Sequence, residues 1–157
     1  MEGNAELSLR KAMLEDIDFL YELRNDDEVR KNSFHTERIA YEKHMSWFRG
    51  KLRDADAQIF ILMLGDKRVG QIRLDAAGNG REISYALCRE ARGSGYSKWM
   101  LGDVENKIRQ HHLGDEAHIV LIGEVKRENI ASRKVFRSLG YQEEETGFGF
   151  QYQKILQ

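Results

Sequence analysis

The sequence predicts one domain of the α/β (α+β) class, built on a mixed, mostly antiparallel sheet. Three segments in the middle of the chain are rich in apolar residues and are joined by glycine-containing turns, which is typical of antiparallel strands. Amphipathic segments with helical spacing precede and follow this centre. Because 157 residues suffice for one buried core, we expect a single domain over residues 1–157, with six to seven strands and about four helices.

The first third of the chain is predicted to be mostly helical. Residues 7–12 alternate in polarity and indicate a short strand. Residues 14–26 carry apolar side chains near helical spacing and predict a helix. A second short helix or turn is expected over residues 25–34, and a further helix over residues 41–52.

The middle of the chain is predicted to be an antiparallel meander. Residues 58–64, 68–75 and 81–88 read as strands, and the turns between them contain Gly65 and the segment 77–80.

The last third returns to helices and strands in alternation. A long amphipathic helix begins at Tyr96, and we expect it to end near Gly114. A shorter helix is bounded by Asn129, a good N-cap residue, and Gly140, a good residue just past a helix end. The remaining predicted strands cover residues 118–125, 141–144 and 148–156.

The composition argues against several classes of function. The net charge of −1 provides no basic surface for nucleic acid or an anionic membrane. No apolar run approaches the about 18–20 residues of a membrane-spanning helix, and the N-terminus lacks the regions of a signal peptide. A single cysteine, Cys88, fits a reducing, cytoplasmic setting and is expected to be a small buried hydrophobe. His111 and His112 are adjacent, so they point to different faces of a helix, and no metal site is expected.

The segment CREARGSGYSKWML, from Cys88 to Leu101, places a glycine turn between a predicted strand and a predicted helix. Gly93 and Gly95 would let the backbone adopt positive φ or approach a ligand closely. A helix N-terminus favours an anion, most often a phosphate, and Arg92 could add positive charge. The turn lacks the lysine and hydroxyl residue of a P-loop and the third glycine of a dinucleotide fingerprint. An ordinary tight turn is the alternative interpretation.

This turn and a second motif resemble the GNAT superfamily of acyl-CoA-dependent N-acetyltransferases. The family's turn, Gln/Arg-x-x-Gly-x-Gly/Ala, is similar to Glu90–Gly95, with Glu90 as a departure at the first position. The second motif, ENIASRKVFRSLGY, is carried by Asn129, Ser132, Phe136, Gly140 and Tyr141. The resemblance implies the GNAT fold, acetyl-CoA as acetyl donor, and contacts to it from Leu87, Arg92, Gly93, Ser94, Gly95, Tyr96, Ser97, Asn129, Ser132 and Phe136.

The resemblance also implies a direct attack of a neutral amine on the acetyl thioester, within a ternary complex. A free backbone N–H near Leu87, between two splayed strands, would polarise the carbonyl. Glu124 is the expected general base, desolvated by its apolar neighbours in the sequence, and Glu82 is the second candidate. Many family members use a tyrosine as general acid, and this position is Phe136, which has no proton to give. The acid therefore stays unassigned among solvent, Tyr85, Tyr141 and Tyr152.

The N-terminal segment is similar to acetyltransferases of nucleotide-activated amino sugars of the pseudaminic-acid type. The residues that carry this similarity are Arg24, Asn25, Asp26, Val29, Arg30, His44, Trp47 and Phe48. Among them, Arg30, His44 and Trp47 are expected to bind the acceptor, since arginine suits a diphosphate and an aromatic face can pack on a sugar or base.

The predicted activity is thus N-acetylation of a small-molecule amine, a nucleotide-linked amino sugar of surface-glycan synthesis, without nucleic-acid or membrane partners. Two alternatives stay open. One is acetylation of a protein N-terminus, of the ribosomal-protein type, or of a small amine. The other is a coenzyme-A-binding module without catalysis, which the phenylalanine at position 136 keeps open. A homodimer is common for this fold.

Overall fold

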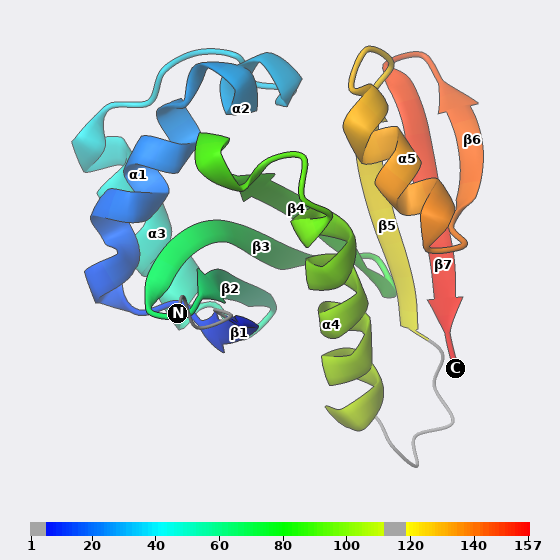
Figure 1. Ribbon diagram of the computed structural model, residues 1–157, viewed down its shortest axis with the longest axis horizontal. Coiled ribbons are helices and arrows are strands. Elements are labelled where there is room, and N and C mark those ends of the chain that lie inside the picture. Colours follow the sequence, from blue (N-terminus) through cyan, green and yellow to red (C-terminus); the bar gives the residue numbers. More distant parts are fainter. Residues whose placement is uncertain (1–5, 112–118) are drawn as a thin grey trace, which may run out of the picture.

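The computed structural model describes residues 6–111 and 119–157. Within these ranges, seven strands form one sheet in the order β1-β2-β3-β4-β5-β7-β6 (Figure 1). Neighbouring strands are antiparallel except β4 and β5, which are parallel. The predicted mixed, mostly antiparallel sheet is therefore confirmed. The strands are β1 (Leu7–Lys11), β2 (Ala57–Leu64), β3 (Lys67–Ala77), β4 (Gly80–Leu87), β5 (Ile119–Lys126), β6 (Gln142–Thr146) and β7 (Gly149–Leu156).

The described residues form five α-helices, where the sequence predicted about four, because the segment after residue 25 is a true helix. The Asp26 carboxylate starts this helix by accepting hydrogen bonds from the backbone N–H groups of Glu28 and Val29, both at 3.0 Å. The expected end of the long fourth helix near Gly114 lies outside the described residues. The helices are α1 (Ile17–Asn25), α2 (Asp27–Asn32), α3 (Tyr41–Arg53), α4 (Tyr96–His111) and α5 (Ile130–Ser138), with 3₁₀ turns η1 (Leu14–Asp16) and η2 (Arg89–Ala91).

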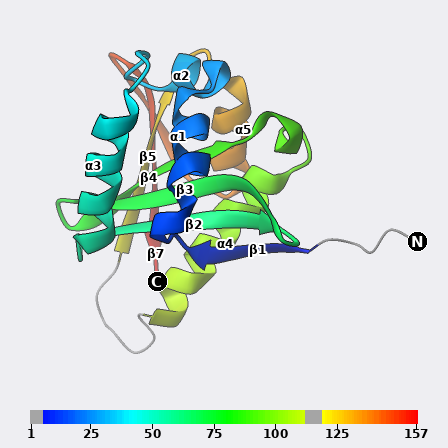
Figure 2. The ribbon, with the colours of Figure 1, turned by 90° about the vertical axis from the view of Figure 1, so that its left-hand side faces the viewer.

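The sheet carries helices on both faces, and each face has its own apolar core. Alternation along β2 sends Ile59 and Ile61 to one face, where they pack with Leu20 of α1 and Phe48 of α3. The other face of β2 joins the larger core under α4 and α5. Figure 2 shows α1 and α3 in front of the strands, with α4 behind them. Helices α1 and α3 therefore lie on one face of the sheet, and α4 and α5 lie on the other.

The parallel pair β4 and β5 separates after a short contact. Their ladder joins Gly80–Ile83 only to Val120–Gly123, although both strands continue further. The ring of Phe136 from α5 lies against Gly123, where a Cβ atom would overlap it. The strands then diverge between α4 and α5 (Figure 1). This splay leaves backbone groups of β4 without a strand partner on one side.

Candidate active site

The glycine turn has the geometry of a phosphate cradle. Gly93 and Gly95 have φ angles of 82° and 80°, which side chains other than glycine rarely adopt. A Cβ atom at either glycine would meet nothing within 4 Å, so the space around the turn is open. The turn leads directly into α4, whose first N–H groups have no partner within the helix. The residues present thus fit a pyrophosphate, and the contacts expected from Gly93, Ser94, Gly95, Tyr96 and Ser97 stay a prediction.

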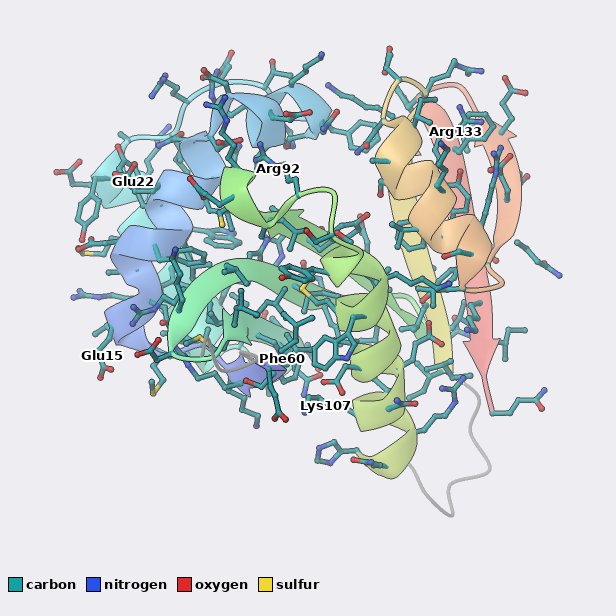
Figure 3. All side chains as sticks on the ribbon, viewed as in Figure 1. Glu15, Glu22, Phe60, Arg92, Lys107 and Arg133 are labelled. Carbon is teal, nitrogen blue, oxygen red and sulfur yellow. The ribbon has the colours of Figure 1, made fainter. Side chains whose placement is uncertain are left out.

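Arg92, predicted to add charge to this turn, is engaged with α2 instead. Its guanidinium donates to the Asp26 carboxylate at 2.7 Å and lies 3.5 Å from a Glu28 carboxylate oxygen. Figure 3 shows Arg92 between the η2 turn and α2. Burial would raise the pKa of Asp26, but hydrogen bonds from the Val29 N–H and from Arg92 outweigh it and lower this pKa. The pair connects the cradle to the N-terminal helices.

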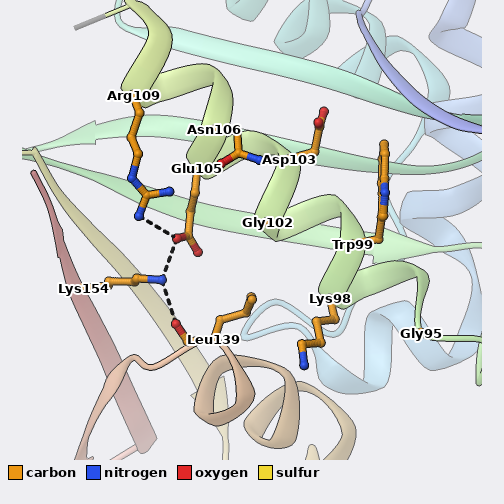
Figure 4. Close-up of a pocket in the computed structure, with 10 residues that line it drawn as sticks. All are labelled: Gly95, Lys98, Trp99, Gly102, Asp103, Glu105, Asn106, Arg109, Leu139 and Lys154. Carbon is orange, nitrogen blue, oxygen red and sulfur yellow. Dashed lines mark hydrogen bonds and ion pairs between the residues drawn. The ribbon is translucent and has the colours of Figure 1, made fainter. Parts of the chain in front are cut away.

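A groove of about 570 Å³ continues from Gly95 along α4 (Figure 4). Lys98 and Trp99 line it near the start of α4. Further along the helix it is lined by Glu105, which is only 3% exposed and accepts a hydrogen bond from Lys154 Nζ at 2.6 Å. The full lining is Gly95, Lys98, Trp99, Gly102, Asp103, Glu105, Asn106, Arg109, Leu139 and Lys154.

The splay exposes the backbone donor that was expected near Leu87. The Cys88 N–H donates to Val69 O on β3 at 2.9 Å. Because successive N–H groups of a strand point to opposite sides, the Leu87 N–H points away from β3, to the side from which β5 has diverged. A donor here can bind the carbonyl oxygen of an acyl group placed between the strands.

The second motif also lines this region. The Asn129 side chain caps α5 by accepting from the Ser132 N–H at 3.2 Å. The Ser132 hydroxyl lies 2.7 Å from the Tyr85 hydroxyl on β4. Phe136 is 1% exposed and stacks on Tyr152 with ring centroids 5.0 Å apart. The motif therefore supplies a hydroxyl that pairs with Tyr85, and a buried apolar ring beside it.

Both predicted bases lie on the face of the sheet opposite α4, because Glu82 and Glu124 alternate with the core residues Ile83 and Val125 along their strands. Glu82 is partly buried and is the register partner of Asp75 on β3. Burial raises the pKa of Glu82, the negative charges of Glu124 and Asp75 raise it further, and Arg73 opposes them. Glu124 is exposed, so the desolvation expected there was wrong. The carboxyl with the environment of a general base is Glu82.

A basic cluster lies beside these carboxylates, formed by Arg24, Arg30, Arg73 and His44. Burial lowers the pKa of Arg24, and the charges of Arg30 and Arg73 lower it further. Burial and the charge of Arg24 likewise lower the pKa of His44, which is 3% exposed. Arg24 Nη1 and His44 Nε2 are buried without a hydrogen-bond partner in the described part of the chain. Such orphaned polar atoms carry a free-energy cost that a ligand would relieve.

The other predicted acceptor residues belong to the same surroundings. Trp47 is 37% exposed, and the Arg73 guanidinium lies over its ring at 4.9 Å from the centroid. Arg30 donates to Asp27 at 2.6 Å and to the backbone oxygen of Asn25 at 3.1 Å, so it also braces α2.

A second hollow of about 440 Å³ lies between the end of α2 and the loop joining β6 to β7. It is lined by Lys31, Asn32, Phe34, Lys126, Glu128 and Phe148. Phe148 is 83% exposed, an unusual environment for a large apolar side chain, and Phe34 is 45% exposed.

Sequence reasoning missed Arg73 and Asp75. Both alternate along β3 with the buried residues Ile72 and Leu74, and this alternation was the available signal. Their role depends on contacts from other elements, since Lys51 of α3 also donates to Asp75 at 2.6 Å.

None of the helices in the described ranges combines the length and apolarity that crossing a membrane requires.

The sequence matches the family model described as "Acetyltransferase (GNAT) domain" over residues 6–142. No curated protein matches the sequence significantly.

Solved structures share the fold at low sequence identity. A domain from Methanocaldococcus jannaschii has a TM-score of 0.81 at 18% identity, covering 97% of this chain and 99% of that chain. A spermidine N-acetyltransferase from Vibrio cholerae, in complex with CoA and spermine, has a TM-score of 0.79 at 16% identity, covering 96% and 95%. An acetyltransferase from Salmonella typhimurium that modifies the N-terminal serine of ribosomal protein L7/L12 has a TM-score of 0.77 at 16% identity, also covering 96% and 95%.

Proposed function

Because this chain belongs to the GNAT acetyltransferase family, as its match over residues 6–142 shows, we propose that it acetylates the amine of a nucleotide-linked amino sugar. Acetyl-CoA is the acetyl donor, and similar folds are solved with CoA or acetyl-CoA bound. The observation that carries the choice of acceptor is the basic cluster beside Glu82, with its buried and unpartnered Arg24 and His44 atoms.

The donor is held by the chain's own residues in three places. The positive-φ glycines Gly93 and Gly95 and the start of α4 would hold the pyrophosphate. The groove beyond Gly95 is large enough for the adenosine end, and its Lys98 offers a cation. The Leu87 N–H would donate a hydrogen bond to the carbonyl oxygen and stabilise the negative charge that develops on it. When bound, acetyl-CoA supplies the thioester that the amine attacks.

Glu82 takes the proton of the attacking amine, directly or through a water. Its raised pKa makes it a better proton acceptor near neutral pH than an ordinary carboxylate. Asp75 stays ionised, because hydrogen bonds from Lys51 and Arg73 outweigh burial and lower its pKa. The carboxylates Glu82, Asp75 and Glu124 together attract a protonated amine to the place where it must lose its proton.

The basic cluster would bind the anionic part of the same acceptor. An isolated polyamine has only positive charges, which Arg24, Arg30 and Arg73 would repel. A diphosphate, in contrast, offers oxygens to the orphaned Arg24 Nη1 and to His44 Nε2. The aromatic residues of the second hollow, Phe34 and Phe148, provide faces on which a base could stack. An acceptor with an amine at one end and a phosphate at the other fits both charges.

The test is an acceptor panel with acetyl-CoA as donor: a UDP-linked 4-amino sugar, a peptide with an N-terminal serine, and spermidine. We expect the UDP-sugar to show the highest kcat/KM. The Arg24→Gln and His44→Gln variants should lower that value about tenfold or more, with unchanged affinity for acetyl-CoA. Arg38→Gln is the matched control, because Arg38 lies in the same segment but is 69% exposed. Faster acetylation of the peptide or of spermidine would overturn this choice of acceptor and leave the family assignment intact.

A further inference from the structure

The hydrogen bond between Tyr85 and Ser132 joins β4 to α5, beyond the point where β4 and β5 separate. Its oxygen atoms are 2.7 Å apart. Tyr85 lies two residues beyond Ile83, the last residue of β4 that pairs with β5. Alternation along β4 places Tyr85 on the same face as Ile83 and Leu87, the face that α4 and α5 cover. A tyrosine hydroxyl therefore lies where the strands have parted, on the side of the second motif.

The same region lacks a hydroxyl where the motif would place one. Phe136 follows Ser132 by one helical turn, so the two side chains lie on the same side of α5. The Phe136 ring is buried against Gly123 and carries no polar atom. The Tyr85 ring lies 6.2 Å from the Phe136 ring, edge to face. Tyr141 and Tyr152 lie closer to this ring, at 4.9 and 5.0 Å, but Tyr85 alone of the three stands on β4, beyond the point where β4 stops pairing with β5.

The two other tyrosines considered from the sequence are engaged elsewhere. The Tyr141 hydroxyl lies 3.4 Å from the buried carboxylate of Glu105, a residue that lines the α4 groove. The Tyr152 hydroxyl donates to Glu143 at 2.7 Å, on the outer strand β6. Tyr85 alone among these three bonds to a hydroxyl, and a hydroxyl can turn to accept or donate as its surroundings change.

We propose that Tyr85 donates a hydrogen bond to the coenzyme A sulfur as the thioester breaks, in place of a residue from α5. The inference rests on acetyl-CoA as donor and holds for any acceptor amine. The amine nitrogen bonds to the acetyl carbon, the carbon–sulfur bond breaks, and its electron pair stays on sulfur. The amine proton passes to Glu82 and then to solvent, and solvent protonates the thiolate after release. Tyr85 keeps its proton throughout and lowers the free energy of the departing thiolate.

The environment of Tyr85 suits a donor that does not ionise. Burial raises the pKa of Tyr85 to about 12, and the hydrogen bond with Ser132 opposes this only in part. The phenol is therefore neutral over the range in which the amine can be deprotonated. A fixed neutral donor stabilises a developing anion because it needs no reorganisation at the moment of reaction.

The experiment is a titration of the thiol of bound CoA, followed by carbon NMR of CoA labelled at the carbon next to sulfur. A donor to the thiolate lowers the pKa of the bound thiol. In the Tyr85→Phe variant we expect this pKa to rise by about one to two units, with unchanged affinity for CoA. Tyr152→Phe removes a hydroxyl from the same aromatic cluster and should leave the thiol pKa unchanged. In turnover, Tyr85→Phe should lower kcat at least tenfold with little change in KM for acetyl-CoA.

Equal thiol pKa values in wild type and Tyr85→Phe, both with CoA bound, would overturn the role of Tyr85 and leave the function intact. A fall in CoA affinity with an unchanged thiol pKa would also overturn it, since Tyr85 would then act only in packing. A wild-type protein that binds no CoA would overturn the donor assignment itself, and the role of Tyr85 with it.

Discussion

Arg92 Nη2 lies 2.7 Å from Asp26 Oδ2, so the residue just before the glycine turn is ion-paired with the residue that caps α2. The two residues are 66 positions apart in the chain. The pair joins the predicted cofactor cradle to the helices of the acceptor half. Asp26 thus has two roles, as helix cap and as ion-pair partner.

These two roles can be separated by substitution. Asp26→Asn keeps an oxygen for the cap and loses the charge, whereas Asp26→Ala loses both. We expect Asp26→Ala to lower the free energy of unfolding by about 1 kcal/mol more than Asp26→Asn does, measured by urea denaturation. Asp26→Asn should cost at most about 1 kcal/mol, because both partners are partly exposed. Equal losses in the two variants would contradict the capping role.

A side chain introduced into the glycine turn should abolish the binding of acetyl-CoA. Gly95→Glu places a side chain at a φ of 80° and a negative charge in the cradle, so calorimetry should detect no acetyl-CoA binding. Gly50 lies inside α3 with open space around its Cα. Gly50→Ala should therefore bind acetyl-CoA normally and unfold with up to about 1 kcal/mol more free energy. Normal binding by Gly95→Glu would mean that the turn is only structural.

The ion pairs of Asp16 should make the free energy of unfolding fall in acid. Asp16 is fully buried and accepts from both Arg10 and Arg68 at 2.7 Å. Burial raises its pKa, but bonds from Arg10, the Met13 N–H and Arg68 outweigh this and lower the pKa to about 2. A lowered carboxyl pKa contributes stability that is present above the unfolded value near 3.8 and is lost as pH falls toward 2.

Asp16→Asn should therefore destabilise the protein by about 2–3 kcal/mol at neutral pH, and the difference from wild type should shrink as pH falls through this window. Denaturant unfolding at a series of pH values measures it. A difference that does not change with pH would argue against this ion-pair cluster.

The pH dependence of turnover should identify the base. If Glu82 must be ionised, kcat/KM rises with pH, and its acid limb lies above the ordinary carboxyl range because the pKa of Glu82 is raised. Glu124→Gln removes one charge that raises this pKa, so the limb should move to lower pH with activity retained. Glu82→Gln should lower kcat by about 10²-fold or more. The reverse result, with activity lost in Glu124→Gln and kept in Glu82→Gln, would make Glu124 the base.

Much of the fold could be predicted because it depends on local patterns. Apolar segments between glycine-containing turns define the central strands, and Asn129 and Gly140 mark the ends of α5 by capping rules that act within one turn. The positive φ of Gly93 and Gly95 is likewise a property of a few neighbouring residues. The phosphate cradle could be predicted from the sequence for the same reason.

The tertiary structure decided what depends on contacts between distant segments. The sequence alone favoured Glu124 as the desolvated carboxyl, yet the folded sheet exposes it and sets Glu82 beside Asp75. Arg92 was expected at the phosphate and lies against α2. The burial and the electrostatic surroundings of a side chain depend on neighbours from several elements. The unpartnered buried atoms of Arg24 and His44 therefore follow from packing and not from local spacing in the sequence.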